Sequence, residues 1–266
     1  MKKTLQISNG IALVSTIIIN YLSNTGKINN TTIGEVSKEL NSLFTPAGYA
    51  FSIWGFIYLL LIGFIIYQGR SLFVKVRNND FILKTGWWFV ISCVANSAWV
   101  FAWLYGYTGL SCVFIFLLLL SLLKIVINNA MELWDAPIST ILFLWWPFTF
   151  YSGWVTVASI ANVSSYLVKT DWDGFGISPV IWTISMIGIA TLVNIMVTWK
   201  RNMREFALVG AWALIAIAVA NKSEQETIYI TAVVAAILLL VSSGIHGFKN
   251  RATNPFIKLK EFRDQR

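Results

Sequence analysis

The sequence predicts an all-α integral membrane protein with about eight transmembrane helices. Hydrophobic residues make up 57% of the 266 positions and charged residues only 12%, and the mean hydropathy is +0.68. Soluble domains do not have this balance, whereas proteins that cross the bilayer many times do. Eight apolar runs are long enough to span as helices. They cover residues 5–22, 46–67, 85–104, 110–126, 138–167, 178–199, 206–220 and 227–245.

The first run and the last two runs need separate comment. Lys2 and Lys3 precede the first run, as in a secretory signal peptide, but no clear small-residue cleavage site follows it. We therefore expect a retained helix. The runs at 206–220 and 227–245 are rich in small residues, which permit close helix packing within the chain or in a homodimer.

The basic residues predict which helix ends face the cytoplasm. With a cytoplasmic N-terminus, the inner segments hold all but four of the 20 Lys and Arg residues, the exceptions being Lys27, Lys38, Lys169 and Lys222. Cytoplasmic loops of membrane proteins are enriched in these residues, so both termini are expected in the cytoplasm. The net charge of +8 therefore reflects topology and not nucleic-acid binding. The basic tail at 247–266 is expected to lie against anionic lipid headgroups.

The first outer loop is the only long one, and it contains a short helical pattern. Ile33, Val36, Leu40 and Leu43 recur at helical spacing, with Thr31 or Thr32 as a candidate cap. Two interpretations are open. The segment either lies on the membrane surface as an amphipathic helix, or it forms a lid over a cavity that opens outward.

Groups for acid–base or metal chemistry are missing from the predicted spans. The twelve acidic residues lie in loops or at helix ends, whereas ion-coupled transporters usually need ionisable groups near the midplane. Cys93 and Cys112 fall in separate apolar runs, and His246 is the single histidine. No nucleophile–base pair can be assembled from these residues. The sequence therefore predicts no metal site, no catalytic residue and no required cofactor.

Three predicted spans carry faces of aromatic and amide side chains at helical spacing. Such faces suit a largely apolar, flat ligand with few polar groups. The alternative is that the tryptophans pack or form an interfacial belt and that the asparagines join helices. The residues are Phe51, Trp54 and Tyr58 in the second span, Asn96, Trp99 and Trp103 in the third, and Tyr151, Trp154, Ala158 and Asn162 in the fifth. Trp54, Trp99, Ala158 and Asn162 lie within about 15 Å of the outer ends of their spans, and Trp154 lies somewhat deeper, so the faces can meet in the outer half beneath the long loop.

The same faces contain three motifs in chain order: a proline eight residues before a tryptophan with a tyrosine four residues later, N-x-x-W, and Y-x-x-W-x-x-x-A-x-x-x-N. They are met by Pro46, Trp54 and Tyr58, by Asn96 and Trp99, and by Tyr151, Trp154, Ala158 and Asn162. In this the chain resembles the translocator-protein family (TspO/MBR, or tryptophan-rich sensory proteins). The resemblance implies a five-helix membrane bundle over residues 1–168 that binds porphyrins, sterols and other hydrophobic ligands. It assigns the ten aromatic, amide and alanine residues above to ligand binding.

Further features of the chain relate to this resemblance. Val163, Tyr166 and Lys169 fit a loose sterol-contact pattern. Residues 169–246 have no counterpart in the five-helix proteins and are expected to form three additional transmembrane helices, so the chain resembles an extended branch. Phe150 replaces a family proline, and Thr45 and Ser52 stand where prolines are usual. These departures bear on pocket shape and hence on ligand identity.

The resemblance implies a membrane receptor or carrier for a tetrapyrrole or another flat hydrophobic ligand, held in an aromatic cavity in the outer half of a bacterial plasma membrane. The expected partners are membrane lipid and a hydrophobic small molecule. A transporter of a small hydrophobic solute is one alternative, in which the three extra helices form a second wall. A light-dependent porphyrin-degrading enzyme is another, since some bacterial relatives are said to use pocket tryptophans in this way. The residues themselves give the enzymatic alternative no independent support.

Overall fold

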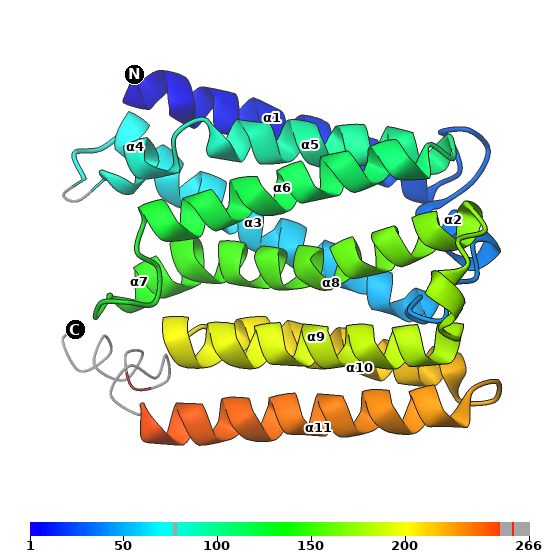
Figure 1. Ribbon diagram of the computed structural model, residues 1–266. Coiled ribbons are helices and arrows are strands. Elements are labelled where there is room, and N and C mark those ends of the chain that lie inside the picture. The colour runs from blue at the N-terminus through cyan, green and yellow to red at the C-terminus, as the bar shows by residue number, and fades with distance from the viewer. Residues whose placement is uncertain (77–78, 251–256, 258–266) are drawn as a thin grey trace.

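The computed structural model describes residues 1–76, 79–250 and 257, and in this part of the chain it consists of helices and loops without strands. The helices run up and down along one common direction (Figure 1). The long ones are α1 (Lys2–Asn24), α3 (Ile53–Gly69), α5 (Trp88–Leu104), α6 (Thr108–Asn128), α8 (Trp146–Lys169), α9 (Pro179–Arg201), α10 (Arg204–Asn221) and α11 (Glu226–Lys249). The short ones are α2 (Ile33–Glu39), η1 (Gly48–Ser52), η2 (Arg70–Leu72), α4 (Phe81–Thr85), α7 (Ile138–Thr140), η3 (Ile141–Trp145) and η4 (Gly174–Gly176).

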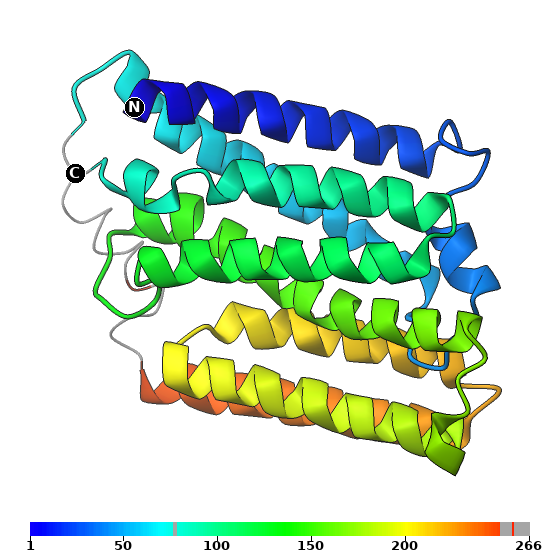
Figure 2. The same cartoon turned by 45° about the horizontal axis from the view of Figure 1, so that its top comes forward.

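The two ends of the bundle differ. The start of α1, helices α4 and α7, and the end of α11 lie at one end, which we call the N-terminal end; α2 and the loop around it lie at the other, the α2 end (Figure 1). Helices α9, α10 and α11 form a group beside α8 (Figure 2), and α10 contacts α8, α9 and α11. The five long helices before α9 and the group after them therefore share one bundle.

The prediction of a helical membrane protein is confirmed. Seven helical stretches among the described residues are long and apolar enough to cross a bilayer: Lys2–Asn24, Gly48–Leu72, Thr108–Asn128, Ile138–Lys169, Pro179–Arg201, Arg204–Asn221 and Glu226–Lys249. Large apolar side chains such as Ile11, Ile66 and Leu192 remain exposed on the outer helices. In a bilayer these faces meet lipid, so their exposure costs nothing.

The third predicted span is shorter than expected. A span at 85–104 was predicted, but α5 begins at Trp88 and has 17 residues, a length of about 25 Å. Gly86 has φ of 54° and ends the preceding short helix α4. A left-handed glycine of this kind stops a helix, and average hydropathy does not detect it.

The longest span contains a local irregularity. Residues 141–145 form a π-helical turn inside the continuous helix Ile138–Lys169, immediately before Pro147. Proline has no N–H group and its ring collides with the carbonyl four residues earlier, so the normal α-helical ladder cannot pass through it. The wider turn lets the helix continue across the proline.

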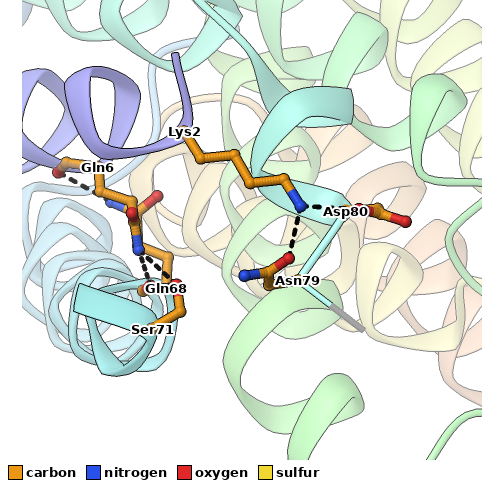
Figure 3. A network of polar contacts seen from close by, with 6 residues as sticks. All are labelled: Lys2, Gln6, Gln68, Ser71, Asn79 and Asp80. Carbon is orange, nitrogen blue, oxygen red and sulfur yellow. Dashed lines mark hydrogen bonds and ion pairs between the residues drawn. The ribbon is translucent and has the colours of Figure 1, made fainter. Parts of the chain in front are cut away.

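Polar side chains fix α1 to its neighbours at the N-terminal end (Figure 3). Gln6 Nε2 donates to the Gln68 carbonyl oxygen and, at 2.8 Å, to Ser71 Oγ. Lys2 Nζ binds Asp80 Oδ1 at 2.8 Å and also contacts Asn79. The Lys2 partner lowers the pKa of Asp80. Helix α1 is therefore part of the folded bundle.

Helix α10 contacts the segment that precedes α3. Trp212 Nε1 donates to the Ala50 carbonyl oxygen at 3.3 Å, and Ala47 N–H donates to the Ala216 carbonyl oxygen at 3.0 Å. The Trp212 ring also meets the Tyr49 ring edge-on, with centroids 5.3 Å apart. The C-terminal helices thus support the backbone that leads into one of the aromatic faces.

Candidate functional site: an aromatic cavity beneath α2

A small cavity of about 40 Å³ lies at the α2 half of the bundle, between α3, α5, α6 and α8. It has room for only a few water molecules, so a larger ligand fits only when the walls move apart. Almost all of its wall is apolar. It is lined by Ile33 and Ser37 of α2, Pro46 and Phe51 of the following segment, and Trp54, Trp99, Trp103, Ile115, Leu118, Trp154, Val155, Val157, Ala158, Ala161, Asn162 and Ser165.

One face of α8 forms the longest wall. Trp154, Ala158 and Asn162 are four residues apart, so successive turns place them one above the other. Ala161 and Ser165 continue the same face toward the end of the helix. The small side chains leave space that larger ones would fill, and this space is what the cavity consists of.

Aromatic rings from separate helices meet at the cavity wall. The Trp54 and Trp154 rings lie edge-to-face with centroids 6.4 Å apart, and Phe51 meets Trp154 in the same way at 6.1 Å. Trp99 and Trp103 stack at 5.9 Å. These tryptophan side chains are buried, with exposed fractions of 8% or less. The alternative of an interfacial belt does not describe them, because belt residues face the headgroups.

Asn162 holds three helices together at the cavity wall. Its Oδ1 accepts from Trp99 Nε1 at 2.7 Å, and its Nδ2 donates to Ser111 Oγ at 2.8 Å and to Cys112 Sγ at 3.0 Å. Both donor hydrogens of the amide are thereby used. Asn162 positions the Trp99 indole and joins α8 to α5 and α6, which is the role of interhelical amides in membranes.

A second hydrogen-bonded chain lies behind the wall. Asn20 Nδ2 of α1 donates to Asn96 Oδ1 at 2.7 Å, and Asn96 Nδ2 donates to the Tyr151 hydroxyl at 2.9 Å. The Tyr151 ring contacts Trp54 edge-on, and the Tyr58 ring stacks on Trp54, each with centroids 5.6 Å apart. Seven of the ten predicted residues therefore line the cavity, whereas Tyr58, Asn96 and Tyr151 lie outside the lining and support it.

Two indole N–H groups at the cavity have no acceptor. Trp54 Nε1 and Trp154 Nε1 are buried and make no hydrogen bond within the described part of the protein. The Tyr58 hydroxyl behind Trp54 is also unpaired. Most buried polar groups in folded proteins are hydrogen-bonded, so unpaired donors at a cavity indicate where a polar group of a ligand can bind.

Helix α2 covers the cavity at the α2 end of the bundle. Thr32 caps it through a capping box with Glu35, and the Thr32 backbone and hydroxyl hydrogen bonds lower the pKa of Glu35. Ile33 is buried and lines the cavity, and its carbonyl oxygen accepts from Trp103 Nε1 at 3.2 Å. Ile33 and Ser37 of α2 border the cavity, which favours the lid interpretation of this segment. Thr32, and not Thr31, is the cap.

The three residues of the sterol-contact pattern lie elsewhere on α8. Tyr166 is 37% exposed and its ring lies over Gly109 of α6. Lys169 Nζ donates to the Gly106 carbonyl oxygen in the turn between α5 and α6. Lys169 also borders a groove of about 450 Å³ beside α2, which shares no lining residue with the aromatic cavity. Val163, Tyr166 and Lys169 do not line the cavity.

The geometry agrees with a family comparison. A family model described as TSPO-like protein matches residues 6–245. The chain belongs to the TSPO-like protein family. No curated protein and no solved structure was found to match it.

The family match covers more of the chain than the sequence motifs do. The resemblance carried by the sequence motifs covers about residues 1–168 of this TSPO-like protein, but the match continues through α9 and α10 and most of α11. The division of the chain into a five-helix bundle, three additional helices and a tail stays a prediction, and the tail lies almost wholly outside the described residues. Within the described residues, no three His, Cys, Asp or Glu side chains gather as metal ligands.

Sequence reasoning missed the partners of the two asparagines. Asn20 donates a hydrogen bond to Asn96, and Ser111 accepts one from Asn162. Neither Asn20 nor Ser111 belongs to one of the three sequence motifs. A signal was present on α1, where Gln6, Asn9 and Asn20 break an apolar run and share the buried face. Polar residues at helical spacing in a membrane span indicate a face directed into protein.

Proposed function

We propose that this TSPO-like protein is a membrane receptor or carrier that binds a tetrapyrrole or a comparable flat, hydrophobic ligand in the aromatic cavity. The observation that supports the proposal best is the gathering of Trp54, Trp99, Trp103 and Trp154 around one cavity. Indole faces stack on extended π systems, and burial of a large apolar ligand against them is favourable.

The unpaired donors narrow the chemistry of the ligand. A ligand that brings a carbonyl or carboxylate oxygen to Trp54 Nε1 or Trp154 Nε1 would satisfy a buried N–H group. A pure hydrocarbon would leave both donors unpaired. The amides of Asn96 and Asn162 contribute indirectly, because their N–H groups already bind protein atoms and hold the rings in place.

Ligand entry requires movement of the lid. The Trp54, Tyr151 and Trp154 rings are in contact at 5.6 and 6.4 Å between centroids, so a macrocycle cannot insert between them without displacement. We infer that α2 moves outward, since it covers the cavity and is fixed to α5 by few hydrogen bonds. In the proposed orientation the N-terminal end faces the cytoplasm of a bacterial cell and the cavity opens on the opposite side.

Porphyrin titration tests the proposal. Purified protein in lipid nanodiscs should shift the absorbance of protoporphyrin and lose tryptophan fluorescence with saturation at one site. Ala158→Phe fills the cavity from α8 and should abolish binding, whereas Val168→Phe, on an exposed part of the same helix, should not. Equal binding by both variants would refute the site.

Counterflow of labelled porphyrin in proteoliposomes separates the two forms of the proposal. A carrier exchanges ligand across the membrane, and a receptor binds it without exchange.

The close packing of α10 on α8 bears on the choice between carrier and receptor. A Cβ on Gly153 of α8 would lie only 3.2 Å from Val209 Cβ of α10. This contact attaches the C-terminal helices to α8 and favours the receptor form over a carrier in which they move as a second wall.

A further inference from the structure

A group of ionisable side chains is buried at the N-terminal end, far from the aromatic cavity. Glu132 lies in the loop between α6 and α7, Arg204 and Glu205 begin α10, and His246 lies near the end of α11. Their exposed fractions are 8%, 8%, 8% and 1%. The start of α10 and the loop after α6 lie at the same end of the bundle (Figure 1). Burial of charged groups is costly unless the charges are compensated.

The two carboxyl groups are incompletely satisfied. Glu205 Oε1 accepts from Trp146 Nε1 at 3.1 Å, but Glu205 Oε2 is buried and has no hydrogen-bond partner among residues 1–76, 79–250 and 257. Glu132 Oε1 is likewise buried and has no partner in this part of the chain. A neutral carboxyl group has an O–H that can donate, so one bound proton both removes a charge and supplies a missing donor.

The surrounding charges do not balance two carboxylates. Arg204 is the cation that interacts with both Glu132 and Glu205. Arg201, at the end of α9, donates instead to the carbonyl oxygens of Val126 and Met131. His246 faces Asn202 and Asn250, and Asp135 of the same loop is exposed. With both carboxyl groups ionised, the described residues at this end of the protein would leave one of the two buried negative charges without a facing cation.

The pKa of Glu132 agrees with this excess of carboxyl groups over cations. Burial, and then the neighbouring Glu205 carboxyl group, raise the pKa of Glu132 to about 8, against the opposing effect of Arg204. Near neutral pH the Glu132 side chain is therefore mainly protonated. Two carboxyl groups that share an environment titrate as a pair, so the proton belongs to both.

We propose that Glu132 and Glu205 form a proton-binding site, and that the bound proton keeps the start of α10 docked against the loop that follows α6. The docking contacts lie around the site. Asn202 Nδ2 donates to the Glu132 carbonyl oxygen at 3.0 Å, and Asn202 and Glu132 both have left-handed backbones, with φ of 59° and 61°. Non-glycine residues keep this conformation only where surrounding contacts hold it.

The sign of the pH effect follows from the proton count. The folded protein holds a proton on Glu132 up to about pH 8, whereas the unfolded chain releases it near pH 4.3. Between these values the folded state binds more protons, so its stability decreases as pH rises through this window. Above about pH 8 this contribution to the stability of the folded state is lost completely. The contact between the start of α10 and the loop after α6 is then weakest.

Infrared spectroscopy of the full-length protein in nanodiscs tests the site directly. The wild type should show a protonated-carboxyl C=O band at pH 6 that disappears with a midpoint near pH 8, and Glu132→Gln should remove this band. Glu224→Gln, at an exposed loop residue at the α2 end, is the matched control and should keep it. Absence of a band sensitive to Glu132→Gln would overturn the proposal.

Thermal unfolding provides a second, independent readout. The melting temperature of the wild type should fall between pH 6 and pH 9, and Glu132→Gln, which carries a permanently neutral side chain of the same shape, should lose this dependence and melt above the wild type at pH 9. Glu205→Gln should flatten the same profile. A Glu132→Gln variant that keeps the wild-type pH profile would contradict a shared proton at this site.

Discussion

The indole N–H of Trp99 donates a 2.7 Å hydrogen bond to Asn162 Oδ1 at the wall of the aromatic cavity. Two residues 63 positions apart in the chain thereby fix the distance between α5 and α8 at the level of the site. The bond fixes the Trp99 indole at the cavity wall and uses one of the two lone pairs of Asn162 Oδ1. The amide is a structural support for the indole.

This relationship predicts coupled effects of substitution. Trp99→Phe and Asn162→Leu should each destabilise the protein, and a double-mutant cycle should give a coupling energy of about 0.6 to 1.7 kcal/mol, the range for interhelical hydrogen bonds in membranes. Unfolding in mixed micelles monitored by circular dichroism provides the four free energies. Strict additivity of the two substitutions would show that the bond contributes nothing.

The contact between α9 and α10 predicts a steric effect. A Cβ on Gly210 would overlap the buried side chain of Asn194, so Gly210→Ala should destabilise the protein by about 1–3 kcal/mol. Gly188→Ala, on α9 with open space around it, is the control and should be neutral or slightly stabilising. Thermal melting of both variants measures the difference. Equal melting temperatures would refute close packing at Gly210.

The attachment of the lid predicts a kinetic effect. Asn29 Nδ2 donates to the Leu104 carbonyl oxygen at 2.7 Å, and Asn29 and Asn30 have left-handed backbones that glycine can adopt. Asn29→Gly should keep the turn but release the lid, raising the porphyrin dissociation rate roughly 2- to 10-fold, as expected for the loss of one hydrogen bond. Asn30→Gly serves as the control. Stopped-flow dissociation gives both rates, and identical rates would exclude a lid held by Asn29.

The sequence predicts the helices well because bilayer thickness constrains their length. Apolar runs of about 20 residues leave few alternatives to spanning helices, and the helical spacing of Trp154, Ala158 and Asn162 correctly predicts one face. Hydropathy does not predict the helix break at Gly86, because the backbone conformation of this glycine ends α4 there. Such a break is local and leaves the average composition unchanged.

The interior of the site is less accessible to sequence reasoning. Which group each amide binds depends on the rotation of neighbouring helices, so Asn20 could not be paired with Asn96 from spacing alone. The burial of Glu132 and Glu205 depends likewise on how α10 docks against a distant loop. Their positions at helix ends suggested solvated charges, and only the assembled bundle brings them together.

The most direct test of the central claim is a structure of the protein in nanodiscs with bound protoporphyrin. If porphyrin binds in the aromatic cavity, planar density should appear inside the bundle beneath α2, in contact with Trp54, Trp99 and Trp154. An oxygen of the ligand should lie within hydrogen-bond distance of Trp54 Nε1 or Trp154 Nε1. Density on the lipid-facing surface, or an aromatic cavity left empty at saturating porphyrin, would contradict it.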